Sequence, residues 1–226
     1  MKISKILFSF ISALICCSVS YAASWPQMYI GVQGGLANTN FSISNVKLNQ
    51  ANGGGPVTSA NISNHISAIR GYAGYRWNEY LALEGGYLKP RSTRFQNING
   101  GGFDTGWINQ YAIDVTGKLF LPMATYIHLS PYLKAGGAYM SSSTGGSIVR
   151  NGASNFGYSL HPLLGVGIGY NFTPYLVGDI SWTNITKYNS NIPQTNLFFA
   201  GLTYYFSVAE TKSNSPNFGD MTNDDS

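Results

Sequence analysis

The chain has 226 residues, of which 10% are charged, 14% are aromatic and 27 are glycine, and its formal net charge is +4. Soluble globular domains carry about a quarter charged residues, so this composition argues against an ordinary soluble domain. The only cysteines are Cys16 and Cys17, which excludes a disulfide framework and a thiolate nucleophile from the rest of the chain.

Residues 1–22 have the layout of a secretory signal peptide rather than of a retained anchor. Lys2 and Lys5 precede an uncharged and mostly apolar stretch, Ile6–Val19, which is too short to span a bilayer as a helix. Small residues at Ser20 and Ala22 then fit a cleavage site after Ala22. Cleavage would remove both cysteines and leave 13 − 2 = 11 basic against 9 acidic residues.

Eight segments alternate between apolar and small or polar residues, which predicts β-strands. In the clearest one the even positions from 156 to 172 are apolar and most odd positions are small or polar. Strands in soluble proteins usually run about 5–6 residues, whereas a strand that spans a bilayer needs ~9–11. In chain order the predicted strands are Met28–Leu36, Ile66–Trp77, Tyr80–Lys89, Trp107–Leu121, Ile127–Tyr139, Phe156–Phe172, Tyr175–Asn184 and Thr195–Phe206.

Short and long connections alternate along the chain. The tight turns are Trp77–Glu79, Pro122–Thr125 and Asn171–Pro174, and the long loops are Ala37–His65, Pro90–Gly106, Ser141–Asn155 and Ile185–Gln194. Bacterial outer-membrane barrels have short periplasmic turns and longer extracellular loops. The sequence therefore predicts an all-β protein, an eight-stranded antiparallel transmembrane β-barrel with up-and-down topology over residues 23–206 and both termini periplasmic. Residues 207–226, with one lysine against four carboxylates, are expected to be a short, disordered acidic tail.

The chain resembles the small outer-membrane barrels of the OmpA transmembrane-domain and opacity-type family. The resemblance rests on the signal peptide, the opening Tyr29–Gly35, the strands rich in Gly and Tyr, and the closing Gly201–Phe206, and it covers residues 25–206. It implies location in the outer membrane and recognition of the closing strand by the barrel-assembly machinery. The tail is too short for the peptidoglycan-binding domain of some relatives, so that activity is not expected here.

Six charged residues are predicted to point into the barrel. They carry three charges of each sign, which indicates a network of salt bridges with Gln33, Tyr72 and His161 as hydrogen-bond partners. An eight-stranded barrel is just wide enough for its side chains to fill it, which favours a packed polar core that closes the lumen. The alternative is a narrow gated channel for small solutes, as the resemblance implies for some relatives. The six residues are Arg70, Glu84, Asp114, Lys118, Lys134 and Asp179.

His128 and Ser130 lie two apart on one strand face and could form a base–nucleophile pair. Some small barrels that resemble this one deacylate lipid A with a His and a Ser spaced in this way. The predicted position near a periplasmic turn, and the absence of an orienting carboxylate nearby in the sequence, favour a hydrogen-bonding role instead. We therefore expect no catalytic residues, no cofactor and no metal site, and nothing in the sequence resembles a nucleic-acid-binding module.

The predicted outer loops and rim carry a positive charge. Six cations face only Asp104, in loops rich in Gly, Ser and Asn that we expect to be flexible. Cations at such a rim attract the phosphates of lipopolysaccharide, and adhesion to a host surface ligand is the sharper alternative. The cations are Lys47, Lys89, Arg91, Arg94, Arg150 and Lys187. The sequence therefore favours a structural outer-membrane barrel that supports envelope integrity and presents surface loops.

Overall fold

The computed structural model describes residues 27–41, 46–48, 54–100, 105–121, 128–150, 156–187 and 193–207, without the side chains of residues 149, 150, 156, 157 and 207. The predicted signal peptide, the turn at Pro122–Thr125, Asp104 and the tail from residue 208 onward lie outside the described residues. Within the described ranges, no helix is long and apolar enough to cross a membrane.

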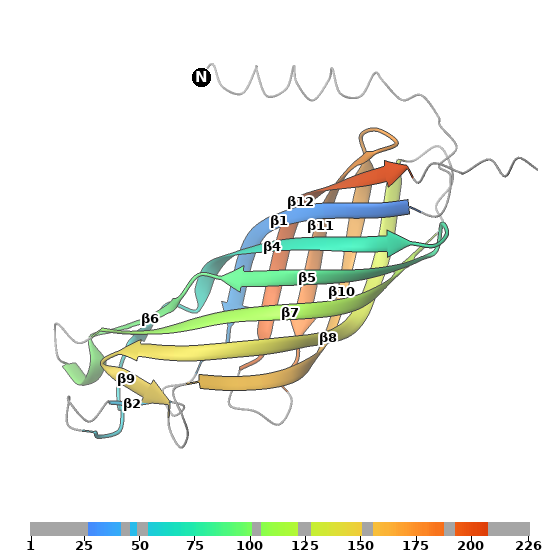
Figure 1. Cartoon of the computed structure of the whole chain (residues 1–226). Coiled ribbons are helices and arrows are strands. Elements are labelled where there is room, and N and C mark those ends of the chain that lie inside the picture. The colour runs from blue at the N-terminus through green and yellow to red at the C-terminus, as the bar shows by residue number, and fades with distance from the viewer. Residues whose placement is uncertain are drawn as a thin grey trace, which may run out of the picture.

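Eight long antiparallel strands form the wall of a closed barrel (Figure 1). Pairing of β1 with β12 and of β7 with β8 closes the ring. The predicted fold class is thus confirmed, but β8 runs to Gly146, well beyond its predicted end at Tyr139. The wall strands are β1 (Gln27–Thr39), β4 (His65–Arg76), β5 (Leu81–Pro90), β7 (Gly106–Phe120), β8 (Leu129–Gly146), β10 (Phe156–Asn171), β11 (Leu176–Ile185) and β12 (Thr195–Ser207).

The register of the strands shows how strongly the barrel is staggered. From Gln33 on β1, the row of paired residues through β4, β5 and β7 reaches Met140 on β8. The row in the other direction, through β12, β11 and β10, reaches Ser130 on the same strand. The difference, 140 − 130 = 10 residues, is the shear of the barrel, and together with the strand number it fixes a lumen that side chains can fill.

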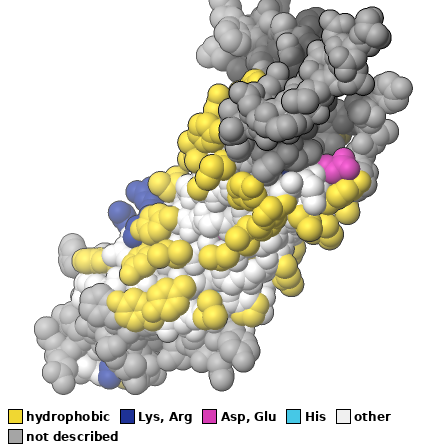
Figure 2. Space-filling view, turned by 45° about the vertical axis from the view of Figure 1, so that its right-hand side comes forward, with side chains coloured by type: hydrophobic (Ala, Val, Ile, Leu, Met, Phe, Trp, Pro, Cys, Tyr) yellow, Lys and Arg dark blue, Asp and Glu magenta, His cyan; other side chains and the backbone are white. Residues whose placement is uncertain are grey.

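Alternation along each strand separates an apolar outer face from a buried inner face. On β5 the exposed residues alternate without a break with buried ones, and β7 follows the same rule. Large apolar side chains such as Val32, Ile69 and Ile180 are more than half exposed on the outer face, and Figure 2 shows apolar side chains spread over the barrel wall. So much exposed apolar surface is incompatible with water and fits the hydrocarbon core of a bilayer.

Buried side chains fill the inside of the barrel in layers. Near the short turns lies an aromatic cluster of Tyr29, Tyr72, Phe120, Tyr132 and Tyr205, together with Ala82. Toward the long loops lies a mostly aliphatic cluster that includes Leu88, Met140, Leu163 and Leu197, together with Phe199. The register places the charged side chains between these two layers, since on β4 Arg70 stands between Tyr72 and Ala68.

The long loops fold into a structure of their own at one end of the barrel (Figure 1). It contains β2 (Val46–Leu48), which pairs with β9 (Ile148–Arg150), and β3 (Asn61–Ile62), which pairs with β6 (Thr93–Gln96). A 3-10 helix, Ile98–Gly100, follows β6. We call these five elements and the described residues that join them the loop head. Its apolar core consists of Val46, Val57, Phe95, Ile98 and Ile148, packed with Ile108 of the wall strand β7.

Asn99 connects two loops of the head through its side chain and backbone. Its Oδ1 accepts hydrogen bonds from Thr58 N at 2.7 Å, Thr58 Oγ1 at 3.0 Å and Ser59 N at 3.3 Å, and its Nδ2 donates to Pro56 O at 3.0 Å. Its φ of 52° is a left-handed conformation that Asn tolerates better than most residues. The described part of the head is therefore packed rather than extended, because the scattered apolar residues of three loops come together there.

Candidate functional site

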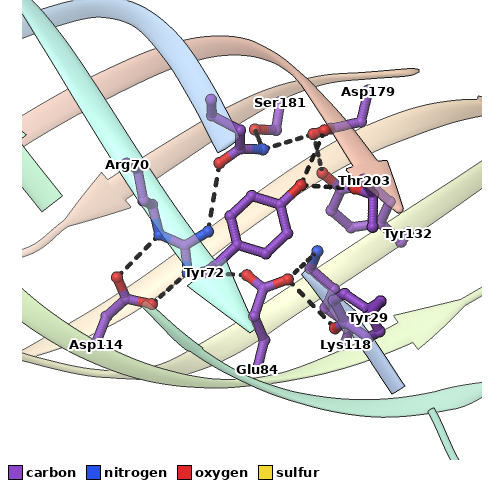
Figure 3. A network of polar contacts seen from close by, with 11 residues as sticks. Tyr29, Arg70, Tyr72, Glu84, Asp114, Lys118, Tyr132, Asp179, Ser181 and Thr203 are labelled. Carbon is purple, nitrogen blue, oxygen red and sulfur yellow. Dashed lines mark hydrogen bonds and ion pairs between the residues drawn. The ribbon is translucent and has the colours of Figure 1, made fainter. Parts of the chain in front are cut away.

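Four of the predicted lumen charges form a compact ionic cluster (Figure 3). Arg70 donates from Nε to Asp114 Oδ2 at 2.9 Å and from Nη2 to Asp114 Oδ1 at 2.5 Å. The same Nη2 lies 2.8 Å from Glu84 Oε1, and Lys118 Nζ lies 2.5 Å from Glu84 Oε2. Strands β4, β5 and β7 are neighbours in the wall, so their register brings these four side chains together. All four are at most 6% exposed.

Three tyrosine rings surround the ammonium group of Lys118. Its Nζ lies 4.8 Å from the centre of the Tyr132 ring, 5.2 Å from that of Tyr72 and 5.7 Å from that of Tyr29. Tyr29 also donates a hydrogen bond to Glu84 Oε2 at 3.2 Å. A cation over aromatic faces is stabilised by their quadrupoles, most strongly when water is excluded. The ionic cluster and the aromatic layer therefore form one continuous core.

Among the described residues, Asp179 is held by hydrogen bonds and has no ion pair. Gln33 Nε2 donates to its Oδ2 at 2.6 Å, Tyr132 donates to Oδ2 at 3.0 Å and Tyr72 donates to Oδ1 at 3.4 Å. Gln33 also joins this carboxylate to the ionic cluster, because its Oε1 accepts a hydrogen bond from Arg70 Nη1 at 3.3 Å. Sequence reasoning named Gln33 and Tyr72 as partners but missed Tyr29 and Tyr132, whose inward positions in the alternation were the available signal.

Lys134 departs from the predicted network. Among the described residues, no carboxylate lies within ion-pair distance of its ammonium group, although the residue is only 4% exposed. It stands directly opposite Lys118 in the β7–β8 register. His161 has its Nδ1 3.0 Å from Thr186 O. Of the six charges predicted to form a network of salt bridges, four are therefore joined by ion pairs among the described residues, with two cations sharing two carboxylates.

Glycines on the inner face make room for the tyrosine rings. A Cβ atom at Gly31 would overlap the ring of Tyr72, one at Gly74 the ring of Tyr29, and one at Gly167 the ring of Tyr132. Each large ring thus lies across a strand that has no side chain at that point. These inward glycines alternate with outward apolar residues in the sequence. They are needed because a closely packed lumen has no room for both a tyrosine ring and a side chain on the strand that the ring crosses.

A small cavity lies at the short-turn end of the lumen. It measures about 20 Å³ and is lined by residues that include Lys118, Tyr132 and Asp179. Arg76 lies beside it, with its guanidinium 3.8 Å from the centre of the Phe120 ring and a hydrogen bond to Glu79 O at 2.6 Å. A single water molecule would nearly fill such a space.

The cations predicted for the loops and rim lie at the long-loop end. Lys89, Arg91, Arg94 and Lys187 are exposed, and Lys47 is half-buried on β2. Lys89 Nζ lies 5.9 Å from the centre of the Tyr111 ring on the outer face. Arg150 ends β9, but its side chain is not among the described ones. Arg94 lines a cavity of about 440 Å³ beside Trp107.

Residues 8–206 match the family described as "Outer membrane protein beta-barrel domain". This match covers most of the chain and includes every strand of the wall. The chain belongs to the outer membrane protein β-barrel family. Its location is therefore the outer membrane, in agreement with the apolar outer face of the barrel.

A relative and two solved structures resemble this outer-membrane barrel. A Coxiella burnetii protein described as "Uncharacterized protein" is 29% identical over 167 residues, and the match spans 59% of this chain and 65% of that protein. Neisserial surface protein A is 18% identical with a TM-score of 0.50, covering 81% of this chain and 100% of that one. OprG of Pseudomonas aeruginosa is 13% identical with a TM-score of 0.51, covering 80% and 97%. At these identities the two structures show the shared fold alone.

His128 and Ser130, the spaced pair considered in the sequence, lie at the short-turn end of β8. In the described part of the chain, no hydrogen bond joins the two side chains, and the His128 ring lies edge-on to the Tyr170 ring at 6.2 Å. Ser130 lines the small cavity at the short-turn end. No group of three or more metal-ligating side chains occurs among the described residues.

Proposed function

We propose that this outer-membrane barrel supports envelope integrity as a closed structural element and presents the folded loop head at the cell surface. The observation that carries the proposal is the lumen core: an ionic cluster lies between an aromatic and an aliphatic layer, and all three are buried. Such a core would make the barrel rigid and fill its lumen. Contact with other molecules would then fall to the loop head that the barrel carries.

The proposal includes an orientation. The described connections Trp77–Tyr80 and Phe172–Tyr175 are short, whereas the loop head is built from long ones. Barrels of this class expose the long connections to the outside and keep the short turns in the periplasm. We therefore assign the loop head to the extracellular side and both termini to the periplasm, because Gln27 of β1 pairs with Ser207 of β12 at the end opposite the head.

The exposed cations support contact with lipopolysaccharide. Lys89, Arg91 and Arg94 lie on and just beyond β5 at the long-loop end, where the head groups of the outer leaflet would be. Phosphate groups attract such a rim at roughly 1 kcal/mol for each cation near the surface. A folded head also offers a surface with a fixed shape for an extracellular ligand, including a host molecule. During insertion, the closing strand β12 would be read by the barrel-assembly machinery.

The alternative of a narrow gated channel has less support. A gate would have to separate Arg70 and Lys118 from carboxylates at 2.5–2.9 Å and also displace the tyrosine rings around them. Breaking buried ion pairs of this kind is costly.

The test is a strain that lacks the gene, complemented in turn with wild type, Glu84→Gln and Asn99→Ala. Barrier function is measured by the entry of a hydrophobic fluorescent probe. We expect wild type and Asn99→Ala to restore the barrier and Glu84→Gln to restore it poorly, because only Glu84 lies in the lumen core. An intact barrier in the uncomplemented strain would overturn the envelope role, and protease cleavage of the loop head from the periplasmic side alone would overturn the orientation.

A further inference from the structure

A groove runs along the outside of the loop head where β6 meets the start of β7. Its volume is about 440 Å³, within the ~300–1,000 Å³ of small-molecule sites. The groove is lined by Ser92, Arg94, Phe95, Gln96, Thr105, Gly106, Trp107 and Asn109. None of these residues belongs to the lumen core. Phe95 belongs to the core of the loop head, and Arg94 is one of the rim cations, but the groove as a whole has no role in the proposed function.

Trp107 forms a fixed aromatic platform in this groove. A Cβ atom at Gly145 would lie 2.6 Å from its Nε1, and one at Gly146 would lie 2.9 Å from its Cζ3. The indole ring therefore lies directly over the glycine backbone of β8, which leaves no room for it to move inward. It remains 42% exposed and lines the groove, so a ligand can reach it without any rearrangement of the ring.

Polar groups surround the platform. Arg94 is the cross-strand partner of Trp107 and is exposed, and Gln96 is exposed two residues further on. Ser92 Oγ donates a hydrogen bond to Asn109 Oδ1, which fixes the Asn109 amide with its Nδ2 hydrogens turned away from Ser92. The groove thus combines one flat apolar face, two amide groups and one guanidinium.

We propose that this groove binds an anionic saccharide. A sugar ring presents C–H groups on its face, which suit an aromatic platform, and hydroxyls on its edge, which suit Asn109 and Gln96. A carboxylate, sulfate or phosphate on the sugar would pair with the guanidinium of Arg94, whose planar set of N–H donors can bind two oxygens of such a group at once. An acyl chain would leave these polar groups without partners. None of the described carboxylates is placed to pair with Arg94 in the groove, since Glu84, Asp114 and Asp179 lie in the lumen and Glu79 lies at a short turn.

The inference deepens the proposed display of a surface head. It rests on the proposed orientation for access to extracellular sugars, but binding by purified protein does not depend on orientation. Failure of binding in vitro would therefore overturn the saccharide site and leave the orientation standing. Protease cleavage of the head only from the periplasmic side would overturn the orientation and leave the binding site standing.

The experiment uses the mature chain refolded in phospholipid nanodiscs and follows the indole Nε1–H resonances by NMR. The probes are the disaccharide of glucuronic acid and N-acetylglucosamine, and neutral diacetylchitobiose. We expect the acidic probe to shift the Trp107 resonance saturably, with a Kd of about 1 mM, and to bind about fivefold more tightly than the neutral one, as one exposed charged contact would give.

Variants assign the interaction to the groove. Asn109→Ala should weaken binding of the acidic disaccharide several-fold, and Arg94→Gln should remove the preference for it over the neutral probe. Trp182→Ala removes an exposed tryptophan of β11, and Lys89→Gln removes a nearby cation outside the groove; both should bind like wild type. A Trp107 resonance that neither probe moves would overturn the proposal. A loss of binding in Trp182→Ala as large as that in Asn109→Ala would also overturn it. A preference that survives Arg94→Gln would overturn the assigned role of Arg94.

A second arm identifies the source of the sugar. Nanodiscs that contain purified lipopolysaccharide are compared with phospholipid nanodiscs. If lipopolysaccharide shifts the Trp107 resonance and blocks the disaccharide, the groove holds saccharide of the bacterium's own envelope. If the disaccharide still binds, the groove is open to sugars from outside the cell. Both results support a saccharide site, and they separate its two sources.

Discussion

Arg70 binds Asp114 through two parallel hydrogen bonds, from Nε at 2.9 Å and from Nη2 at 2.5 Å. Bidentate pairs of this kind fix geometry as well as charge. Because Arg70 Nη2 also reaches Glu84 and Nη1 reaches Gln33, this one side chain connects strands on both sides of β4. The closed lumen that we propose relies on this connection.

Glu84→Gln should destabilise the barrel strongly. The change leaves Lys118 without a carboxylate in a buried site, and breaking one side of a buried pair costs about 3–5 kcal/mol. The measurement is urea unfolding in lipid vesicles, followed by tryptophan fluorescence. The double variant Glu84→Gln, Lys118→Met should recover part of the loss, and no recovery would mean that the two residues do not act as a pair.

The two neighbouring lysines should respond differently to the same substitution. Lys118→Met removes the partner of Glu84 and should cost about 3–5 kcal/mol. Lys134→Met removes a buried cation that has no ion pair among the described residues, so it should cost less than about 1 kcal/mol or stabilise the protein. Each serves as the control for the other in urea unfolding. Equal losses would show that Lys134 has a carboxylate partner after all.

Gly167→Ala should destabilise the aromatic layer. The added methyl group overlaps the Tyr132 ring and would disturb its hydrogen bond to Asp179, and overpacking of this kind costs about 1–3 kcal/mol. Gly71→Ala is the matched control, because a Cβ atom there has no neighbour within 4 Å. The readout is the urea midpoint of both variants. A control as unstable as Gly167→Ala would point to a general effect of strand glycines instead.

Asn99→Ala should loosen the loop head and leave the barrel intact. Thr58 and Ser59 would lose their shared acceptor, and because these groups are exposed to water the cost to the head should be about 0.5–1.5 kcal/mol. Asn97→Ala is the control, since Asn97 has the same φ of 52° but no side-chain hydrogen bond in the described part of the chain. We expect faster proteolysis of the head only in Asn99→Ala. If both variants are cleaved alike, backbone conformation rather than the side-chain bonds holds the head together.

The sequence predicted the strands of the barrel wall better than the pairing of the side chains inside the lumen. Period-2 alternation depends only on which side faces lipid, so the strands, their order and the inward direction of residues such as Glu84 and Asp114 could be read directly. Pairing inside the lumen depends on register and shear, which no local pattern reveals. Lys118 and Lys134 looked equivalent in the sequence, yet only Lys118 reaches Glu84 among the tyrosine rings.

The loop head was missed for a related reason. Its core takes one or two apolar residues from each of several segments, such as Val57, Phe95 and Ile148. These residues are isolated among Gly, Ser and Asn, so no segment shows a periodic pattern. The groove at Trp107 arises only when β6 is paired with β7.

Single-channel recording in a planar bilayer tests the closed lumen most directly. Refolded wild type, whose folding is verified by its heat-dependent mobility in gel electrophoresis, is compared with the double variant Glu84→Gln, Lys118→Met. The packed core predicts no discrete conductance steps from folded wild type. Reproducible steps from the wild type that change in size in the double variant would show that the charges gate an open path, and would contradict the closed structural barrel.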